Sequence, residues 1–268
     1  MPEILEAEEA RRLIEARALG RRIVAVDAPD AWFLKRGLTP RALRAALPGR
    51  RLVEARRRGK LILLDTSGVG RSRTAGPVVA LHLGMSGRIL IDGDAAGDPL
   101  RYATNREDPA WHRVTLRFAD GGSLALRDPR RLGAVELDPD EDRLGPDAFD
   151  LDLAHLRSVL AVSRAPLKAT LMDQSRIAGL GNLLTDEALW RVGLDPARRA
   201  DSLTPEEVRS LHRTIRSTLR TLQRRGGSHT GDHMDARFPG GLCPRDGAPL
   251  VIRQVGGRTT YSCPQHQR

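Results

Sequence analysis

Four side chains near the carboxyl terminus have the types and spacing of a metal site. Two residues separate Cys243 from Asp246, sixteen follow, and two again separate Cys263 from His266. Thiolate and imidazole are ordinary zinc ligands, and a carboxylate is a less common one. The segment between the pairs reads as two short strands around Gly256 and Gly257, a hairpin too small to stay ordered without metal. We predict a zinc ribbon that holds one structural Zn²⁺.

Two alternatives to this ligand set remain open. His229 or His233 could supply the fourth ligand in place of Asp246, or the hairpin could be a metal-free finger. The chain has only two cysteines, both in this tail. A secreted fold stapled by disulfides is therefore disfavoured.

A second chemical feature is the turn Gly-Leu-Gly-Asn at residues 179–182, which joins two helical patterns. Gly179 and Gly181 permit positive φ and close approach to the backbone. Asn182 can tolerate a left-handed conformation, or it can cap the helix that we expect to begin at Leu183. Because a helix start presents unpaired N–H groups and a partial positive charge, the turn is predicted to bind phosphate. An ordinary helical hairpin is the alternative reading of this segment alone.

The turn lies within DQSRIAGLGNLLTDEALW, residues 173–190. The chain also contains an amino-terminal MPE, a central HLGMSGRI and a later RDPRRLG. With these blocks in this order, the sequence resembles the formamidopyrimidine-DNA glycosylase and endonuclease VIII family over essentially its whole length. The family's helix-two-turn-helix motif reads LxDQxxxxGxGNxxxxExLW. The resemblance implies an α+β fold: an N-terminal β-sandwich domain with flanking helices, then a helical helix-two-turn-helix domain that ends in a β-hairpin zinc finger.

The resemblance also implies catalytic residues. Pro2 aligns with the family's nucleophile, which is a secondary amine once Met1 is removed. Terminal amines titrate near pH 8, roughly 7.7 to 8.0. A basic site could therefore keep a useful fraction of the Pro2 amine unprotonated, and so nucleophilic, at neutral pH. Glu3 aligns with the general acid and Glu6 with a carboxylate that orients the nucleophile. Lys60 aligns with a hairpin lysine that contacts phosphate, although it could be one more charge in the basic run 50–60.

Residues for binding and opening the duplex follow from the same alignment. Met85, Arg130 and Leu132 align with the residues that fill the gap left by an extruded base. Many relatives have phenylalanine where this chain has Leu132, so opposite-base checking is expected to be weaker; hydrophobic core is the alternative for Met85 and Leu132. Departures in the finger are Asp246 and His266, since the family pattern has four cysteines. The expected phosphate contacts are His82, Lys168, Asn182 and Arg258.

Composition agrees with a polyanionic partner. The net charge is +10 and the isoelectric point is near 10.8. Scarce aromatic residues argue against recognition of single strands by stacking rings. No apolar run of about eighteen residues and no signal peptide are present. We therefore expect a monomeric cytoplasmic protein, associated with a bacterial nucleoid, that binds damaged double-stranded DNA and no membrane.

Hydrophobic periodicity places these residues on elements. The stretch 138–152 is acidic, contains two prolines and is predicted to be a linker. It separates an N-terminal catalytic domain at 1–137 from a helix-two-turn-helix domain at 153–227, and 228–268 forms a loop and the finger. Ala10, Leu13, Ile14 and Ala16 are expected to face the core from the first helix. Helices are predicted at 6–19, 40–47, 153–162, 167–172, 183–192 and 205–224, and strands at 23–28, 52–58, 61–65, 78–82, 114–118 and 124–127.

The predicted activity is that of a bifunctional DNA glycosylase and abasic-site lyase of base excision repair, which removes oxidised or ring-opened bases through a Schiff base on Pro2. One rival is a DNA-damage binding protein on the same fold that has lost turnover. A second rival is an RNA-binding helix-two-turn-helix protein. Little chain separates Gly227 from Cys243, so few contacts to a flipped purine are expected. We therefore expect ring-opened purines, oxidised pyrimidines or abasic sites to be processed better than 8-oxoguanine opposite cytosine.

Overall fold

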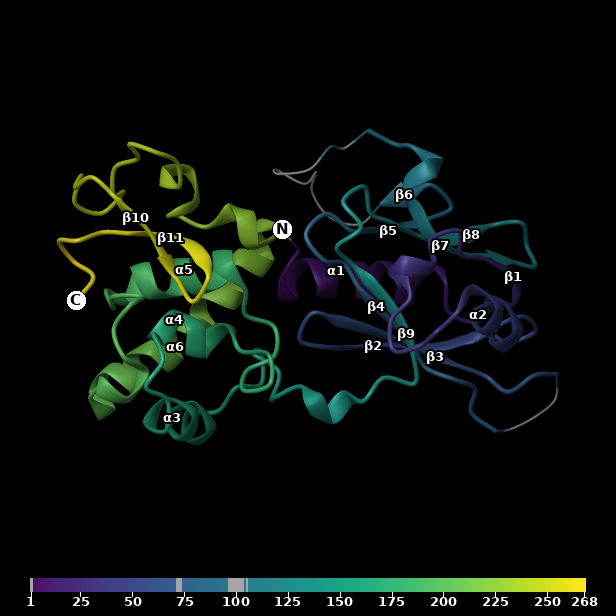
Figure 1. Cartoon of the computed structure of the whole chain (residues 1–268), viewed down its shortest axis with the longest axis horizontal. Helices are drawn as coiled ribbons and strands as arrows, with labels where there is room; N and C mark the ends of the chain where they lie inside the picture. The colour runs from purple at the N-terminus through teal and green to yellow at the C-terminus, as the bar shows by residue number, and fades with distance from the viewer. Residues whose placement is uncertain (1, 71–73, 96–103, 105) are drawn as a thin grey trace. The chain divides into compact units, whose positions relative to one another are not determined.

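The computed structural model describes residues 2–70, 74–95, 104 and 106–268. Within them the chain forms two compact units, which are described separately (Figure 1). The first contains Pro2 and Glu6–Glu141, and the second contains Glu3–Leu5 and Asp142–Arg268. Met1, whose removal the nucleophile prediction requires, lies outside the described residues. The three residues Glu3–Leu5 thus pack with a unit that begins far downstream in the sequence.

Two antiparallel sheets form the first unit, in the orders β1-β7-β8-β5-β6 and β2-β3-β4-β9. Consecutive strands such as β2 and β3 pair across a two-residue turn, so that Arg58 lies opposite Leu61. β7 and β8 pair across the predicted hairpin turn, which Gly121 enters with φ 90°. The strands are β1 Ile23–Asp27, β2 Leu52–Arg58, β3 Leu61–Thr66, β4 Val79–His82, β5 Arg88–Ile91, β6 Asp94–Ala95, β7 His112–Phe118, β8 Ser123–Arg127 and β9 Ala134–Leu137.

Helix α1, Ile4–Arg17, packs into the aliphatic core that both sheets share. Its inward face consists of Ala7, Ala10 and Ile14, which recur at the helical spacing and are almost fully buried. Ala16 was expected on this face but is exposed, because it lies on the opposite side of the helix from Ile14 at about 100° per residue. The remaining helical segments of this unit are α2 Pro40–Ala46, η1 Ala31–Phe33, η2 Pro109–Trp111 and η3 Glu141–Arg143.

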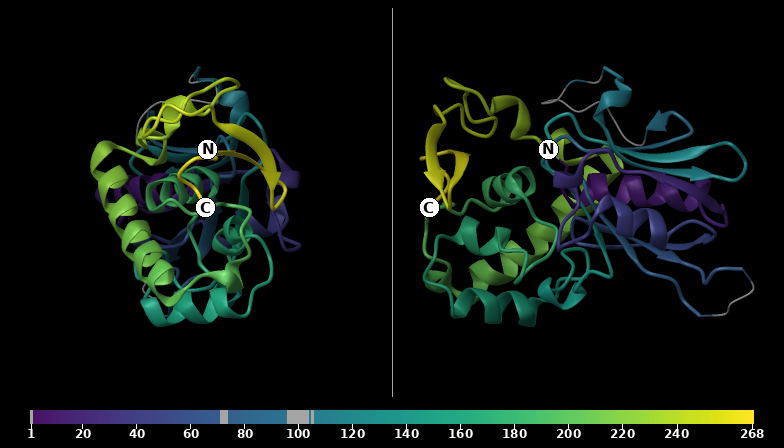
Figure 2. Two further views of the ribbon diagram at one scale, coloured as in Figure 1. Left: turned by 90° about the vertical axis from the view of Figure 1, so that its left-hand side faces the viewer. Right: turned by 45° about the vertical axis from the view of Figure 1, so that its right-hand side comes forward.

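The second unit is helical and ends in a hairpin (Figures 1 and 2). Its core is aliphatic and takes residues from all four α-helices. α5 packs against α6 and also against β11. No helix of the described chain combines the length and apolarity needed to cross a bilayer. The elements are α3 Leu153–Ala161, α4 Leu167–Met172, α5 Asn182–Val192, η4 Ala200–Ser202, α6 Pro205–Arg225, η5 Ser228–Thr230, η6 Met234–Ala236, β10 Val251–Val255 and β11 Arg258–Ser262.

The start of α6 has the capping box that its sequence indicates. The Thr204 hydroxyl accepts the Glu207 N–H at 3.3 Å, and the Glu207 carboxylate accepts the Thr204 N–H at 2.7 Å. Pro205 occupies the first turn, and Gly226 ends the helix in a left-handed conformation with φ 99°. Local sequence alone specifies both ends of this helix.

The second half of the acidic stretch 138–152 belongs to the core of the second unit. Ala148 and Leu151 are almost fully buried there. The Ala148 N–H donates to the Ala178 carbonyl at 2.9 Å, which ties this stretch to the segment before α5. Its acidic and proline-rich composition conceals these two apolar anchors.

Candidate nucleic-acid interface

The N-terminus of α5 binds the carboxylate of Glu3, not the side chain of a neighbouring residue. One Glu3 oxygen accepts the N–H groups of Gly181 at 2.8 Å and Leu184 at 3.2 Å, and the other accepts that of Leu183 at 2.7 Å. Glu3 is 1% exposed. A negative charge at a helix start satisfies orphan N–H groups and interacts favourably with the helix dipole. The residue after Pro2 is therefore held by main-chain donors from the predicted turn.

Neither role considered for Asn182, a left-handed conformation or the N-cap, is observed. Gly181 is the N-cap residue, and α5 begins at Asn182 itself. The Glu3 carboxylate satisfies the orphan donors that an asparagine cap would have used. The Asn182 side chain instead donates through Nδ2 to the Thr259 carbonyl of β11, at 3.2 Å.

Both glycines of the turn are required by close approach of the N-terminal segment. A Cβ on Gly179 would lie 2.5 Å from Ile4 Cδ1, and Gly179 has φ 117°. A Cβ on Gly181 would lie 2.4 Å from the carboxyl carbon of Glu3. Gln174 fixes the turn by accepting the Gly179 N–H at 2.9 Å and donating to the Leu180 carbonyl at 2.9 Å. The two glycines therefore permit close approach to the backbone, as predicted, but the groups that approach are Ile4 and Glu3 of the protein itself.

Arg258 lies at the tip of the β10–β11 hairpin, directly after Gly256 and Gly257. Both glycines have positive φ, 58° and 71°, as a two-residue hairpin turn of this type requires. A Cβ on Gly256 would meet Ala169 of α4 at 2.7 Å, so the tip packs on that helix. Arg258 is exposed and has no side-chain partner within the described residues. It is available to a phosphate.

Lys168 was predicted to contact phosphate, but its side chain is 0% exposed. Its Nζ lies 2.7 Å from an Asp186 carboxylate oxygen and donates to the Thr260 hydroxyl at 2.7 Å. Arg237 contacts the same carboxylate. Burial lowers the pKa of Lys168, and the Asp186 charge opposes that effect. We correct this assignment: Lys168 joins α4 to α5 and β11 and does not present its charge to a ligand.

In the first unit, Asp128 organises the loop that carries Arg130 and Leu132. Asp128 is fully buried, and one of its oxygens accepts the N–H groups of Leu132 and Gly133, each at 2.8 Å. The other accepts the Arg130 N–H at 3.1 Å and the hydroxyl of buried Ser86. Because Ser86 follows Met85, a single carboxylate links the two segments predicted to fill the gap in the duplex.

Glycine contacts bring these two segments together. A Cβ on Gly84 would meet the Leu132 backbone at 2.4 Å, and one on Gly133 would meet the His82 carbonyl at 2.5 Å. Met85 is half-buried and Leu132 is 48% exposed, so neither belongs to the core, which was the alternative reading. The HLGMSG turn and the RDPRRLG loop therefore form one surface.

The two adjacent arginines of this loop have different roles. Arg130 is exposed, and its guanidinium has no partner within the described residues. Arg131 has φ 57° and donates twice to Asp30, at 2.6 Å each. This pair lowers the pKa of Asp30. Arg131 thus anchors the loop, whereas Arg130 remains exposed.

The other predicted residues of the first unit lie at turns and chain ends. Lys60 follows Gly59 at the β2–β3 turn and is half-buried. His82 ends β4, and its Nδ1 accepts the Gly84 N–H at 3.1 Å, so Nε2 carries the proton of the neutral ring. Glu6 lies in the first turn of α1, and Pro2 precedes that helix.

The four predicted metal ligands converge in the second unit. Cys243 Sγ, an Asp246 oxygen, Cys263 Sγ and a His266 nitrogen all lie within 4.8 Å of one another. His266 Nδ1 is 2.7 Å from Asp246 and 3.6 Å from Cys243 Sγ, and Cys263 Sγ is 3.2 Å from Asp246. Donors around a tetrahedral zinc are roughly 3.5 Å apart at usual bond lengths. The donor set and its spacing fit a zinc ion after small shifts.

Trp190, in the last turn of α5, orients this cluster. Its carbonyl lies 3.1 Å from His266 Nε2, which places the ring proton on Nε2 and leaves Nδ1 as an acceptor facing the Asp246 carboxylate. Two acceptors 2.7 Å apart require a cation or a proton between them. The Trp190 indole N–H also donates to Cys243 Sγ at 3.3 Å.

The alternative histidine ligands do not join this group. His233 is fully buried, stacks on Trp190 at 5.5 Å between ring centroids and is absent from the converging donor set, as is His229. Burial lowers the pKa of His233 to about 3. His233 therefore packs as a neutral ring behind Trp190.

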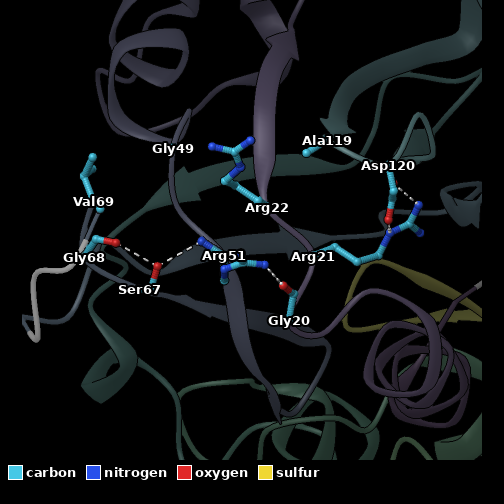
Figure 3. Close-up of a pocket in the computed structure, with 11 residues that line it drawn as sticks. Gly20, Arg21, Arg22, Gly49, Arg51, Ser67, Gly68, Val69, Ala119 and Asp120 are labelled. Carbon is cyan, nitrogen blue, oxygen red and sulfur yellow. Dashed lines mark hydrogen bonds and ion pairs between the residues drawn. The ribbon is translucent and has the colours of Figure 1, made fainter.

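A hollow of about 740 Å³ in the first unit contains none of the predicted site residues (Figure 3). Arg51, which lines this hollow, donates to the Gly20 carbonyl at 2.6 Å. Arg21 is paired with Asp92 and Asp120, each at 2.8 Å, and lowers the pKa of both carboxyls. Most polar groups that line the hollow are thus already paired with other groups of the protein, and no ligand is assigned to it.

Comparison with known proteins covers both units. The family described as "Formamidopyrimidine-DNA glycosylase N-terminal domain" matches residues 1–135, and its "H2TH domain" matches residues 144–233. The chain belongs to the formamidopyrimidine-DNA glycosylase family. It is 36% identical to the formamidopyrimidine-DNA glycosylase of Cereibacter sphaeroides and 35% identical to that of Paracoccus denitrificans, in each case over the full length of both proteins.

Solved structures support the same membership. Lactococcus lactis Fpg bound to DNA containing an abasic site superimposes on this glycosylase with a TM-score of 0.81 at 25% identity, with all of both chains covered. A complex of the same enzyme with DNA containing an oxidised pyrimidine gives 0.80 at 26% identity. The predicted α+β architecture, with a helix-two-turn-helix region and a C-terminal hairpin, is confirmed.

Sequence reasoning missed the residues that position the site. Asp128, Asp186 and Trp190 are the main examples, together with the capping role of Glu3. An Asp before Pro commonly accepts nearby backbone N–H groups, which is a usable signal for Asp128. No local pattern distinguishes Asp186 from the solvent-exposed acids of other helices.

Proposed function

We infer that this chain is a bifunctional DNA glycosylase and abasic-site lyase that acts in base excision repair on damaged duplex DNA. One observation supports the assignment of Pro2 as the nucleophile. The carboxylate directly after Pro2 is bound by three backbone N–H groups at the start of α5. An N-terminal segment anchored in this way holds its amine in a defined place, as a nucleophile needs.

Pro2 supplies the nucleophile in the proposed reaction. After loss of Met1, its neutral nitrogen forms a bond to the sugar C1′ while the bond from C1′ to the damaged base breaks, and the base leaves with a proton. Protonation of the ring oxygen opens the sugar and yields an iminium. Removal of a C2′ proton then expels the 3′ phosphate. Glu3 moves protons in these steps, Glu6 orients the amine and Lys60 contacts a phosphate.

The duplex is proposed to contact both units. Met85, Arg130 and Leu132 fill the gap left by the extruded base, which the shared anchoring of their loops by Asp128 supports. Asn182 and Arg258 contact phosphate from the turn and the hairpin tip, and His82 contacts it from the end of β4. The exposed guanidinium groups of Arg130 and Arg258 support these roles. We propose that the protein works as a monomer in the bacterial cytoplasm, since the relatives above are bacterial.

The proposed cofactor is one structural Zn²⁺ held by Cys243, Asp246, Cys263 and His266. The zinc would hold the hairpin base together and so keep Arg258 in position. The facing acceptors of Asp246 and His266 support a cation at this place.

Ring-opened purines, oxidised pyrimidines and abasic sites are the proposed preferred substrates over 8-oxoguanine opposite cytosine. The short segment between Gly227 and Cys243 is folded onto its own unit: the N–H groups of Asp232 and His233 both donate to Glu187, at 3.0 Å. A segment held by its backbone in this way supplies few contacts to a flipped purine.

Trapping with borohydride tests the nucleophile. Reduction during reaction with abasic duplex should give a stable adduct of protein and DNA, and a Gly-Ser extension left before Pro2 should abolish it while leaving DNA binding in place. Strand cleavage by the wild type without an adduct would contradict the amine mechanism. Tight binding with neither cleavage nor adduct would favour the non-catalytic binding protein, and preference for RNA over duplex DNA would favour the other rival.

A further inference from the structure

A row of arginines runs along the outer face of α6. Arg216, Arg220 and Arg224 are exposed, and within the described residues their guanidinium groups have no acidic partner. Together with Arg213 and His212 they line a shallow hollow that also contains the hydroxyl residues Ser217 and Thr221 and no carboxylate. Arg213, at the start of the row, is the only one of the four arginines near an acid, 3.5 Å from Glu206.

Helix geometry directs this row away from the protein. At about 100° per residue, Arg216, Arg220 and Arg224 centre roughly 140° from the buried stripe that includes Ile215 and Leu219. The arginines recur every four residues, which is about 6 Å along the helix axis. That repeat is comparable with the separation of successive phosphates on one DNA strand. The row therefore matches a phosphate backbone in both sign and spacing.

The row lies apart from the residues assigned to the damaged duplex within this unit. α5 packs against α6 and also against β11. α6 and the β10–β11 hairpin run along opposite sides of the unit when it is viewed from its carboxyl-terminal end (Figure 2, left). A duplex that reaches Arg258 does not thereby reach Arg220.

We propose that the Arg216, Arg220 and Arg224 face of α6 is a second, sequence-independent binding surface for duplex DNA, which holds another DNA segment while the first site is occupied. Each arginine neutralises one phosphate and releases condensed counterions, so binding to this surface weakens steeply with salt. A protein that holds two segments can pass directly from one to the other. This inference goes beyond the repair activity and does not require any catalytic step.

The test asks whether two duplexes bind at once. The wild-type protein is saturated with a short duplex containing a reduced abasic site, which cannot form an imine. An undamaged labelled duplex is then added, and its binding is followed by fluorescence anisotropy at several salt concentrations. We expect a ternary complex at low salt. The triple variant Arg216→Gln, Arg220→Gln, Arg224→Gln should lower the slope of log affinity against log salt by about 2.7, three contacts at about 0.9 each.

A matched control removes the same charge elsewhere. Arg17, Arg117 and Arg199 are exposed, and each pairs with a carboxylate at 2.6 Å. Their triple replacement by glutamine should leave the second binding event close to wild type. Binding of the first duplex, measured separately, should be unchanged in both triple variants, which separates failure of this proposal from failure of the lesion site.

Three outcomes would overturn the proposal. The first is the absence of a ternary complex at low salt although the first duplex is bound. The second is an equal loss in the α6 variant and in its control, which would reduce the effect to net charge. Much tighter capture of duplex RNA than of DNA by the same face would assign the surface to RNA instead.

Discussion

Removal of the Glu3 carboxylate should destabilise the second unit, independently of any effect on catalysis. Glu3 is 1% exposed and accepts three backbone N–H groups from the start of α5. In Glu3→Ala these donors lose their acceptor inside the protein. In Glu3→Gln one acceptor oxygen remains, while the amide NH₂ faces at least one backbone N–H and the charge at the helix start is lost.

The size of the effect follows from these contacts. Loss of a helix cap costs about 0.5 to 2 kcal/mol, and hydrogen bonds to a charged group contribute about 1.5 to 3 kcal/mol each without adding fully. We expect a loss of about 3 kcal/mol for Glu3→Ala. For Glu3→Gln we expect about 1.5 kcal/mol, since the dipole contribution is about 0.3 to 1 kcal/mol and one hydrogen bond is replaced. For a unit of this size, about 4 °C per kcal/mol corresponds to a fall in Tm of about 12 °C and 6 °C.

Thermal unfolding followed by circular dichroism at 222 nm, in the same buffer for all variants, measures this directly. The helical second unit dominates the signal. Glu9→Ala on α1 is the matched control, because Glu9 is half-buried and its nearest basic partner is Arg12 at 3.8 Å. We expect Glu9→Ala to change stability by less than about 0.5 kcal/mol.

The reasoning would be refuted if Glu3→Ala unfolded within 2 °C of the wild type, on the order of half a kcal/mol. The cap would then be absent or replaced at no cost. A Glu3→Gln protein that keeps most of its stability but loses borohydride trapping would instead separate a chemical role of Glu3 from its structural one.

Further expectations concern the loops, the clamp and the metal. Asp128→Asn should disturb the segment that fills the duplex, so base release should fall more than cleavage of a preformed abasic site, and equal losses in both assays would contradict this. Arg258→Ala should lower the salt slope of DNA binding by about 0.9, whereas Asn182→Ala removes a neutral contact and should weaken binding without a comparable change in slope; unchanged binding in both variants would mean that the clamp is misplaced. Elemental analysis should find one zinc per chain, absent from Cys263→Ser, whereas fully active protein without zinc would support a metal-free finger. On a panel of lesion duplexes, 8-oxoguanine opposite cytosine should be cleaved more slowly than ring-opened purines, and the reverse order would show that another segment contacts the flipped purine.

Local patterns were sufficient wherever the interacting groups are close in sequence. A few consecutive residues determine the Thr204 and Glu207 capping box and the Gly256 and Gly257 turn. The same holds for each pair of metal ligands, Cys243 with Asp246 and Cys263 with His266. Propensity and turn chemistry act over such distances, so the helices and most strands of the described chain follow from them. Family resemblance extended these local signals to the domain order.

Only the tertiary structure decided which charged groups are used internally and which remain available. Glu3 accepts donors 178 to 181 residues away, and Asp186 neutralises Lys168 in the interior although both types are ordinary surface residues by sequence. The sequence does not distinguish a lysine that binds a ligand from one in a buried ion pair, because burial depends on how distant segments pack. The sequence by itself determined the elements and the kind of chemistry, and long-range packing decided which side chains are free to perform it.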